Sequence, residues 1–392
     1  MTLKYVSICS GIEAASLAFA PLGWKPLAFS EIEPFPCAVL AHQHPAIPNL
    51  GDMNKFREWP EEILAECDLL VGGPPCQAFS IAGLRDSLDD DRGNLTLVYV
   101  HLIDHIDTIR KKHGKPPVIA LYENVVGLLS VRDNAFGCLV GALCGQDDPV
   151  ETETGKWPTT GILWGAERRV GWRVLDAQYF GLAQRRRRVF VVTVHEELIE
   201  RLGDGCCPSE ILSIAESLRG DTPPRRETRE EVTGTISSRT SGGGGLGTDF
   251  ECSGGLQPVG RRNDLIANTG ANGLGVSEEI APTLDRAQPC AIAYAVQDDT
   301  TPKVSRELNG ALRRDAGGQG ACVMTPLLQV RRLVPVECAR LMGFPDSYLD
   351  IQFKGKSAAD GVKYRALGNS MAIPVMAYLG RKIQEALDTA LI

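Results

Sequence analysis

A run of nine residues, Gly72-Gly73-Pro74-Pro75-Cys76-Gln77-Ala78-Phe79-Ser80, places a thiol directly after a turn-forming segment. Glycines and prolines fix the backbone of such a turn, so the next side chain is presented at a defined position. Cys76 is therefore a candidate nucleophile. An ordinary thiol has a pKa of about 8.5, so it needs activation or a polarised acceptor. The ordinary alternative is a structural cysteine.

Two further polar groups accompany predicted strands. Glu123, in Glu123-Asn124-Val125, directly follows an apolar run and could act as a general acid. The run Gln184 to Arg188 leads into another strand. Because alternate residues of a strand face one side, Gln184, Arg186 and Arg188 can share a face. Either pattern alone is weak evidence for a functional site. A run of charged residues such as Gln184 to Arg188 is usually part of a solvated surface.

Three other motif matches fail on their context. Gly242 to Gly247 satisfies G-x-G-x-x-G, but it follows no predicted strand and opens no helix. Gly355-Lys356-Ser357 resembles the end of a phosphate-binding loop, yet Asp350 stands where the first glycine is required. The aspartates between 86 and 91 lack calcium-loop spacing.

Short apolar runs alternate with helical patterns over the first 195 residues. Strands are expected at Tyr5–Ile8, Pro26–Ser30, Cys67–Val71, Val118–Tyr122, Arg173–Gln178 and Val189–Val194. Helices are expected at Glu13–Ala20, Phe35–His42 and Leu95–Ile109. This alternation predicts βαβ units and a mostly parallel sheet. Ligands bind such sheets at the carboxyl ends of the strands, where Ser10, Glu31, Cys76 and Glu123 fall.

The character of the chain changes after residue 200. Residues 220–330 are rich in Gly, Thr, Ser and Arg. A weak internal repeat occurs there three times, at 234–236, 282–284 and 310–312, and an arginine follows each copy: Arg239, Arg286 and Arg313. A second domain of short strands and loops that displays arginine is expected, with a flexible insertion as the alternative. Helical periodicity returns at Glu337–Met342 and Ile373–Leu387. We therefore expect a first domain over 1–195, a second over 196–330, and a C-terminal segment over 331–392 that completes the first.

The composition limits the class of protein. The net charge is −8, but residues 1–150 carry 11 basic and 19 acidic side chains, whereas residues 151–392 carry 30 of each. Every basic residue between Trp157 and Pro302 is arginine, which suits phosphates and guanine edges, although biased surface usage would explain it equally. The 12 cysteines and 6 histidines lack zinc spacing, so no metal and no disulfide framework are expected. No apolar run could span a membrane and no signal peptide is evident, so a cytoplasmic protein is expected.

Five motifs in order carry a resemblance. They are Gly72 to Ser80, Glu123-Asn124-Val125, Gln184-x-Arg186-x-Arg188, Arg332 to Pro345 and Gly368-Asn369-Ser370. In them the chain resembles the cytosine-C5 DNA methyltransferase family, over residues 1–195 and 330–392. The resemblance implies an α/β fold: a Rossmann-like, S-adenosylmethionine-dependent methyltransferase domain with a smaller, irregular β-rich target-recognition domain at 196–330. The family's first motif, Phe-x-Gly-x-Gly-Gly, reads Cys9-Ser10-Gly11-Ile12-Glu13-Ala14 here, with a single glycine.

The resemblance also implies roles. Cys76 would add to C6 of a cytosine flipped out of duplex DNA, and C5 would then attack the methyl group of S-adenosylmethionine. Glu123, with a pKa raised by burial, would share a proton with N3. Arg186 and Arg188 would orient the base and cap its O2.

The remaining implied contacts concern the cofactor and the DNA. Glu31 would bind the ribose hydroxyls and Asp52 the adenine amino group. The implied cofactor residues are Ser10, Gly11, Ile12, Glu31, Ile32, Asp52, Met53, Pro74, Asn369 and Ser370. The implied DNA-binding residues are Gln77, Ser80, Arg92, Gln184, Arg239, Arg286 and Arg313. Double-stranded DNA is the expected partner of a monomer, with a cognate restriction endonuclease as a further partner in restriction-modification.

Three alternatives stay open. A Cys-His hydrolase needs a histidine beside Cys76, but the nearest, His101 and His105, lie on a predicted helix. A tRNA cytosine methyltransferase would share the motifs, although the long Arg- and Gly-rich insertion favours duplex DNA. An inactive DNA-binding module would be expected to lack Cys76 or Glu123, and both are present.

Overall fold

The computed structural model describes residues 2–75, 95–131, 133–214 and 330–389, and the short segments 256–257, 294–296, 302–304, 309–310 and 322–324. The chain divides into two compact units. The first consists of Met1–Leu175, Arg187–Ala215 and Ser370–Ile392, and the second of Asp176–Arg186 and Glu216–Asn369. Among the described helices, none is both long enough and apolar enough to cross a membrane.

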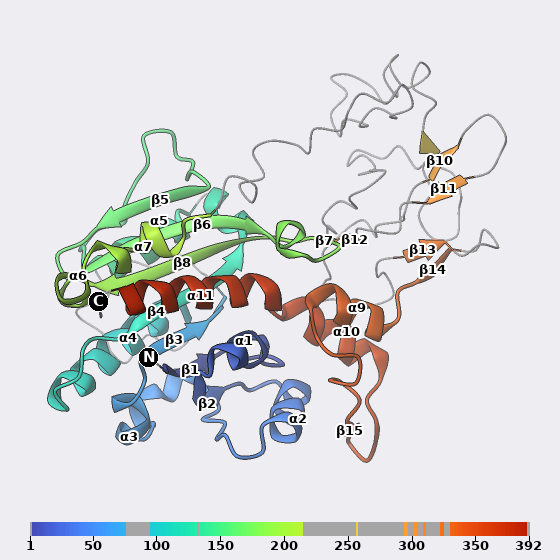
Figure 1. The fold of residues 1–392 in the computed structure, drawn as a ribbon, viewed down its shortest axis with the longest axis horizontal. Coiled ribbons are helices and arrows are strands. Elements are labelled where there is room, and N and C mark those ends of the chain that lie inside the picture. Colours follow the sequence, from blue (N-terminus) through green and yellow to red (C-terminus); the bar gives the residue numbers. More distant parts are fainter. Residues whose placement is uncertain are drawn as a thin grey trace. The chain divides into compact units, whose positions relative to one another are not determined.

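A seven-stranded sheet in the order β2-β1-β3-β4-β8-β6-β5 forms the centre of the first unit (Figure 1). Its strands are β1 (Lys4–Ile8), β2 (Lys25–Ser30), β3 (Leu69–Gly72), β4 (Ile119–Val125), β5 (Thr160–Trp164), β6 (Arg168–Asp176) and β8 (Arg187–His195). Strands β1 to β4 pair in parallel, whereas β8 is antiparallel to β4, and β5 to β6. The chain passes from β1 to β2 on one side and then to β3 on the other. The order therefore reverses at β1, where such sheets bind ligands.

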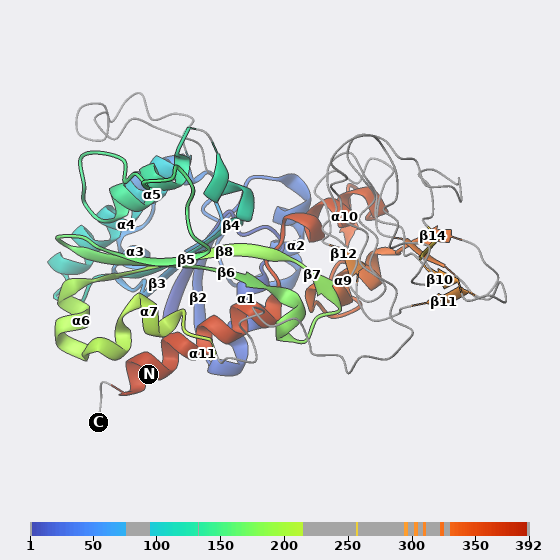
Figure 2. The ribbon, with the colours of Figure 1, turned by 90° about the horizontal axis from the view of Figure 1, so that it is seen from above.

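Helices cover both faces of this sheet. Figure 2 shows α4 and α5 on one face and α6, α7 and α11 on the other. The helices of this unit are α1 (Ala14–Phe19), α2 (Pro34–Gln43), α3 (Glu61–Ala65), α4 (Leu95–Lys112), α5 (Ala135–Leu143), α6 (Glu196–Leu202), α7 (Pro208–Ile211) and α11 (Ile373–Thr389). Short 3₁₀ helices connect them: η1 (Ala20–Leu22), η2 (Met53–Glu58), η4 (Val126–Ser130) and η6 (Asp204–Cys206). All residues of β3 and the first five of β4 are buried, which explains their continuous apolar runs.

The last helix, α11, packs against α1 near the start of the chain. Trp24 Nε1 donates a hydrogen bond of 2.7 Å to Gln384 Oε1 on α11. The Tyr378 hydroxyl on the same helix donates to the Ser213 carbonyl at 2.7 Å. Helix α11 thus joins segments from both ends of the chain, and the Rossmann-like architecture expected from the sequence is confirmed.

The described part of the second unit contains short strands and two α-helices. The strands are β7 (Gln184–Arg185), β9 (Leu256–Gln257), β10 (Tyr294–Val296), β11 (Pro302–Val304), β12 (Asn309–Gly310), β13 (Cys322–Met324), β14 (Val330–Arg332), β15 (Gln352–Phe353) and β16 (Lys356–Ser357). They form one three-stranded and three two-stranded sheets. The 3₁₀ helix η5 (Ala177–Phe180) precedes β7, and α9 (Pro335–Met342) packs against α10 (Asp360–Asn369).

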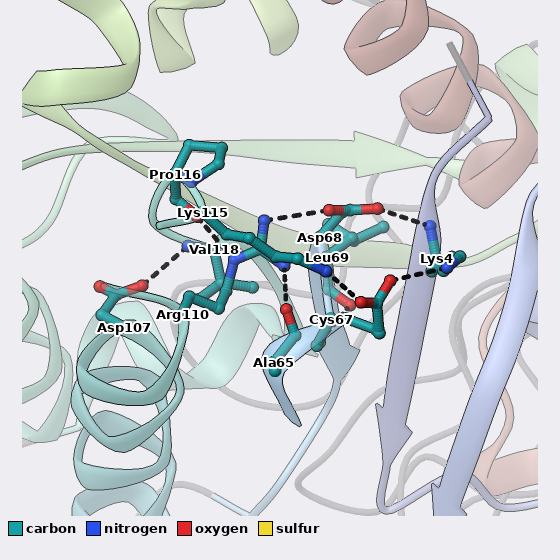
Figure 3. Close-up of polar contacts among 11 residues, drawn as sticks. Lys4, Ala65, Cys67, Asp68, Leu69, Asp107, Arg110, Lys115, Pro116 and Val118 are labelled. Atoms are coloured by element: carbon teal, nitrogen blue, oxygen red, sulfur yellow. Dashed lines mark hydrogen bonds and ion pairs between the residues drawn. The ribbon is translucent and has the colours of Figure 1, made fainter. Parts of the chain in front are cut away.

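A charged cluster closes the amino-terminal edge of the sheet, opposite the predicted site (Figure 3). Its centre is the Arg110 side chain, only 2% exposed. Arg110 donates to the Pro116 carbonyl at 2.6 Å, to the Ala65 carbonyl at 3.2 Å and to Asp68 Oδ1 at 3.0 Å. The other Asp68 oxygen accepts from the Lys4 backbone N–H at 3.0 Å. One guanidinium therefore connects the end of α4 to the starts of β1 and β3.

Replacing Arg110 by alanine leaves the carboxylate of Asp68 and two carbonyl groups without their buried donor. We expect a loss of about 3–5 kcal/mol in the free energy of unfolding, typical of breaking a buried ion pair from one side. Urea unfolding followed by tryptophan fluorescence measures this loss. Lys111→Ala, at the exposed neighbouring position, is the control, with an expected change within about 0.5 kcal/mol. Equal stability of the two variants would contradict this role for Arg110.

Candidate active site

The carboxyl ends of β3 and β4 bring Gly73 and Glu123 into direct contact. Parallel pairing sets Gly72 beside Tyr122, so the next residue of each strand lies at the same edge. A Cβ atom on Gly73 would lie 2.7 Å from the Glu123 carbonyl oxygen and 3.3 Å from Glu123 Oε2. Only glycine leaves this space free, because real Cβ atoms do not approach a carbonyl oxygen so closely.

The two prolines after Gly73 are held by hydrogen bonds to their carbonyl groups. The Pro74 carbonyl accepts from the Tyr122 hydroxyl at 3.2 Å and from Asn124 Nδ2 at 3.1 Å. The Pro75 carbonyl accepts from Thr96 Oγ1 at 3.3 Å. The chain is thus fixed beside Glu123 as far as Pro75.

The predicted nucleophile, Cys76, is the next residue after Pro75 and lies outside the described residues. The predicted DNA contacts Gln77, Ser80 and Arg92 of the same segment also lie outside them. Their roles stay predictions.

Glu123 forms an ion pair with Arg188. Arg188 Nε lies 3.2 Å from Glu123 Oε1, and the two side chains are 14% and 10% exposed. The antiparallel register sets Glu123 opposite Phe190 and Val125 opposite Arg188, so the two charged side chains are diagonal neighbours on one face of the sheet. Arg188 also donates to the Arg187 carbonyl at 2.8 Å. The structure therefore brings together two of the predicted catalytic side chains in a largely dehydrated setting.

Gln184 and Arg186 belong to the second unit, whereas Arg188 belongs to the first. The expected common strand face for these three residues is wrong, because β7 ends at Arg185 and pairs with β12, whereas β8 begins at Arg187 and pairs with β4. Arg186 is buried, and its guanidinium donates to the Gly368 carbonyl at 3.2 Å. Gln184 is fully buried and donates to the Leu341 carbonyl at 3.1 Å. A DNA contact by Gln184 would require its side chain to leave that position. Arg239, Arg286 and Arg313 lie outside the described residues.

Glu31 organises the carboxyl ends of β1 and β2. Its Oε2 accepts from the Gly11 backbone N–H at 2.7 Å, and its Oε1 accepts from the backbone N–H groups of Ile32 and Glu33 at 2.8 and 2.7 Å. A carboxylate offers about four acceptor positions. Donors from the described residues occupy three of them and fix the orientation of Glu31, and within that part of the chain one position remains on Oε2. Ser10 Oγ joins the same edge by accepting from the Ser30 backbone N–H at 3.2 Å.

Asn49 is a positioning residue that the sequence reasoning missed. Its Oδ1 accepts from the Glu31 backbone N–H at 3.0 Å and from the Gly51 N–H at 3.1 Å, while its Nδ2 donates to the Glu31 carbonyl at 3.0 Å. Asn49 thereby holds Glu31 in place and ties it to the loop before Asp52. A lone asparagine in a loop carried no signal that would have identified this role.

The other predicted cofactor residues of the first unit lie along this edge. Ile12 and Met53 are buried, so only their backbones or edges could meet a ligand. Asp52 Oδ1 accepts two hydrogen bonds from Asn54, one from its backbone N–H at 3.0 Å and one from its side-chain Nδ2 at 2.8 Å. These bonds orient the carboxylate at the start of η2. Ile32 is 67% exposed, an unusual position for a large apolar side chain.

Two predicted cofactor residues belong to the last motif, Gly368-Asn369-Ser370. Asn369 is exposed at the end of α10 in the second unit, and Ser370 is buried at the start of the C-terminal segment of the first unit. In the first unit, the carboxylate acceptors Glu31 and Asp52 beside the exposed apolar side chain of Ile32 fit a nucleoside, which offers hydroxyl and amino donors and a flat ring. S-adenosylmethionine carries all three.

A model of the family described as "C-5 cytosine-specific DNA methylase" matches residues 3–143 and 166–385 of the chain. The chain is 38% identical, over 98% of its length, to a protein of Escherichia phage P1 named DNA N-6-adenine-methyltransferase. The chain spans 61% of that relative's length. It is 23% identical to the type II methyltransferase M2.BsuMI of Bacillus subtilis, over 98% of this chain and 76% of the relative.

Among solved structures, Dnmt2 methyltransferase from S. pombe superimposes with a TM-score of 0.54 at 16% identity, covering 98% of this chain and 99% of that one. That likeness concerns the fold. The family match spans both ends of the chain and contains the edge with Glu31, Gly73 and Glu123. The chain therefore belongs to the C-5 cytosine-specific DNA methylase family, whose members transfer a methyl group from S-adenosylmethionine to cytosine in DNA.

Proposed function

We propose that this chain methylates C5 of a cytosine flipped out of a specific duplex DNA sequence, through a covalent bond between Cys76 and C6 of the base. The observation that carries the proposal is the junction of β3 and β4. There the chain is anchored by Pro74 and Pro75, one residue before Cys76, and runs directly beside the carboxylate of Glu123. This arrangement supports the proposal that a nucleophile and an acid come from adjacent strands, as a cytosine ring requires.

The chemistry proceeds by addition and elimination. The Cys76 thiolate forms a bond to C6, and Glu123 shares its proton with N3, so that the electron pair displaced from the C5–C6 double bond resides on C5 as an enamine. When bound, S-adenosylmethionine would supply an electrophilic methyl group to C5 and would leave as S-adenosylhomocysteine, while N3 returns its proton to Glu123. A base then removes the proton from C5, the electron pair re-forms the C5–C6 bond, and Cys76 leaves as thiolate.

Arg188 is proposed to hold Glu123 and the base together. Its ion pair with Glu123 orients the carboxyl group, and a planar guanidinium is a suitable donor to O2 of the cytosine. Arg186 is proposed as a further residue that orients the base. Flipping out the target costs a few kcal/mol of stacking and pairing, which the enclosing protein groups must offset.

The cofactor is proposed to bind along the ends of β1, β2 and β3. The free acceptor position of Glu31 suits a ribose hydroxyl, Asp52 suits the adenine amino group, and exposed Ile32 offers an apolar surface to the ring. Ser10, Gly11, Ile12, Met53, Pro74, Asn369 and Ser370 are proposed to complete the site.

Sequence recognition is proposed to lie in the target-recognition domain at 196–330, with Arg239, Arg286 and Arg313 on the DNA. Gln77, Ser80, Arg92 and Gln184 are proposed as further DNA contacts. The segments 1–195 and 331–392 are proposed to form the catalytic domain of a cytoplasmic, monomeric enzyme. A type II relative supports the further proposal of a cognate restriction endonuclease as partner.

Adenine N6 is a second candidate target, because the phage P1 relative is named for it. N6 is an exocyclic amine whose own lone pair can take the methyl group, so no covalent bond to the ring is needed. The Gly73–Glu123 junction leading to Cys76 has no use in that reaction, which favours cytosine. Nucleosides released from DNA of cells that express the chain should contain 5-methylcytosine. N6-methyladenine without 5-methylcytosine would overturn the cytosine assignment.

Gly73→Ala tests whether the junction positions the acid. The new methyl group would collide with the Glu123 carbonyl and carboxyl oxygens, and a displacement of about 1 Å lowers turnover about a hundredfold. Single-turnover methyl transfer measures the effect. Gly127→Ala is the matched control, because a Cβ there meets no atom within 4 Å. Equal rates for the two variants would remove Glu123 from the reaction.

The covalent step is tested by trapping. Fluorine at C5 cannot leave as a cation, so duplex DNA with 5-fluorocytosine in many sequence contexts should become linked to the protein after methyl transfer. The adduct should require S-adenosylmethionine, survive denaturing electrophoresis and map to Cys76. Cys76→Ser should form none, because a hydroxyl is a far weaker nucleophile.

Each alternative gives a different result in the trapping experiment. A hydrolase would form no adduct, a DNA-binding module would bind reversibly, and a tRNA enzyme would trap fluorocytosine only in RNA. Folded wild-type protein that forms no cofactor-dependent adduct on duplex DNA would overturn the proposed mechanism.

A further inference from the structure

The loop after β1 has an unusual backbone. Three of its five residues have positive φ: Cys9 at 45°, Gly11 at 56° and Glu13 at 61°. Glycine adopts this left-handed region without penalty, but other residues do so only when their surroundings hold them there. Glu13 stands at a position where the family's first motif has glycine. Its side chain must therefore contribute something that offsets the backbone cost.

The Glu13 carboxyl group is buried between β1 and α1. The residue is 1% exposed, and its Oε1 accepts from the Ser16 backbone N–H at 3.0 Å and from Ser16 Oγ at 3.1 Å. Ser16 Oγ is also 2.8 Å from the Tyr5 hydroxyl on β1. Burial raises the pKa of Glu13 to about 7, although hydrogen bonds from Ser7 and Ser16 act in the opposite direction. Tyr5, Ser7, Glu13 and Ser16 form a polar cluster enclosed in the core.

Glu13 directly follows the proposed cofactor contacts Ser10, Gly11 and Ile12 in the chain. The Glu13 backbone N–H donates to the Ser10 carbonyl at 2.9 Å, which closes the loop on itself. Between them, the Gly11 N–H donates to Glu31 Oε2 at 2.7 Å. The direction of the Gly11 N–H, and with it the remaining acceptor position of Glu31, depends on the backbone angles that Glu13 maintains.

We infer that Glu13 is a positioning residue for S-adenosylmethionine: its buried carboxyl group holds the loop Cys9–Glu13 in its left-handed conformation. The inference rests on the proposed cofactor site at the ends of β1 and β2. Glu13 acts through Gly11 and Glu31 and touches no reacting atom.

Three substitutions at position 13 separate this role from simple space filling. Glu13→Gln keeps a carbonyl acceptor for Ser16, so its dissociation constant for S-adenosylmethionine should stay within about threefold of wild type. Glu13→Ala loses the acceptor and keeps the left-handed penalty, so its dissociation constant should rise at least tenfold. Glu13→Gly loses the acceptor but also removes the backbone cost of the positive φ at position 13, so it should bind S-adenosylmethionine more tightly than Glu13→Ala does.

Space filling predicts the reverse order, because glycine leaves the larger cavity. Calorimetric titration of S-adenosylmethionine into the whole 392-residue chain without DNA measures binding apart from catalysis. Ser16→Ala removes the Oγ donor to Glu13 and keeps the Ser16 backbone N–H, so it should weaken binding less than Glu13→Ala does. Melting temperatures recorded for each variant confirm that the folded protein is compared.

A pH series tests the burial of the carboxyl group. The folded protein retains a proton that the unfolded chain releases at the ordinary carboxyl pKa of 4.5, so wild-type stability should fall as the pH rises from 4.5 towards 7. The melting temperature of wild type should fall relative to Glu13→Gln over this range. A constant difference would place the carboxyl group in water and overturn the inference.

The binding results distinguish this inference from the proposed function. Wild-type protein that binds no S-adenosylmethionine would refute the proposed cofactor site and the inference with it. Wild-type protein that binds it as tightly as Glu13→Ala, or a Glu13→Gly variant weaker than Glu13→Ala, would refute the role of Glu13 alone.

Discussion

The contact between Gly73 and Glu123 is the constraint on which the rest of the site depends. Two adjacent parallel strands end at the same level, and each delivers one polar feature: β3 leads to the Gly-Gly-Pro-Pro turn and β4 ends in a carboxylate. Their backbones can approach this closely because residue 73 has no side chain. The Pro74 carbonyl then becomes an acceptor for Tyr122 and Asn124, so the turn is fastened to the strand that carries the acid.

The same sheet edge serves a second purpose at β1 and β2. At those strands, buried or half-buried carboxylates accept hydrogen bonds from backbone N–H groups. Glu31 accepts from Gly11, Glu13 from Ser16 and Asp52 from Asn54. Carboxylates hold these loops, whereas carbonyl groups hold the β3 turn. The opposite edge of the sheet is closed by the Arg110 cluster, which fixes where the strands begin. Fixed starts and fixed ends together give the strands a single register.

Much of this arrangement could be predicted from the sequence, because buried parallel strands are continuous apolar runs bounded by glycine and proline. Five of the six strands expected in the first unit, at β1, β2, β3, β4 and β8, overlap the observed ones over most of their length. The expected strand at Arg173–Gln178 overlaps only the end of β6, which begins at Arg168. Strand β5 was missed because its edge position leaves it half exposed and without a clear period. The run Gln184 to Arg188 was misread as one face because nothing in its letters marks the passage from one unit to the other at Arg186. The role of Asn49 and the burial of Glu13 depend on contacts between distant loops, which local patterns do not encode.

Helix α11 has a consequence for how the protein is made. Its Gln384 accepts a hydrogen bond from Trp24 across 360 positions of sequence. The helix also contacts α1, η1, η6, α7 and the segment after α7. The first unit therefore cannot complete its own packing while it is being synthesised, because the whole second unit must leave the ribosome before α11 does. Contacts of such long sequence separation slow folding and leave apolar surface open in the meantime. Until α11 has been synthesised, the part of α1 that packs against it, including Phe19, stays exposed to solvent. Partly synthesised chains therefore expose an apolar helix surface for longer than a domain whose contacts are all local in sequence would.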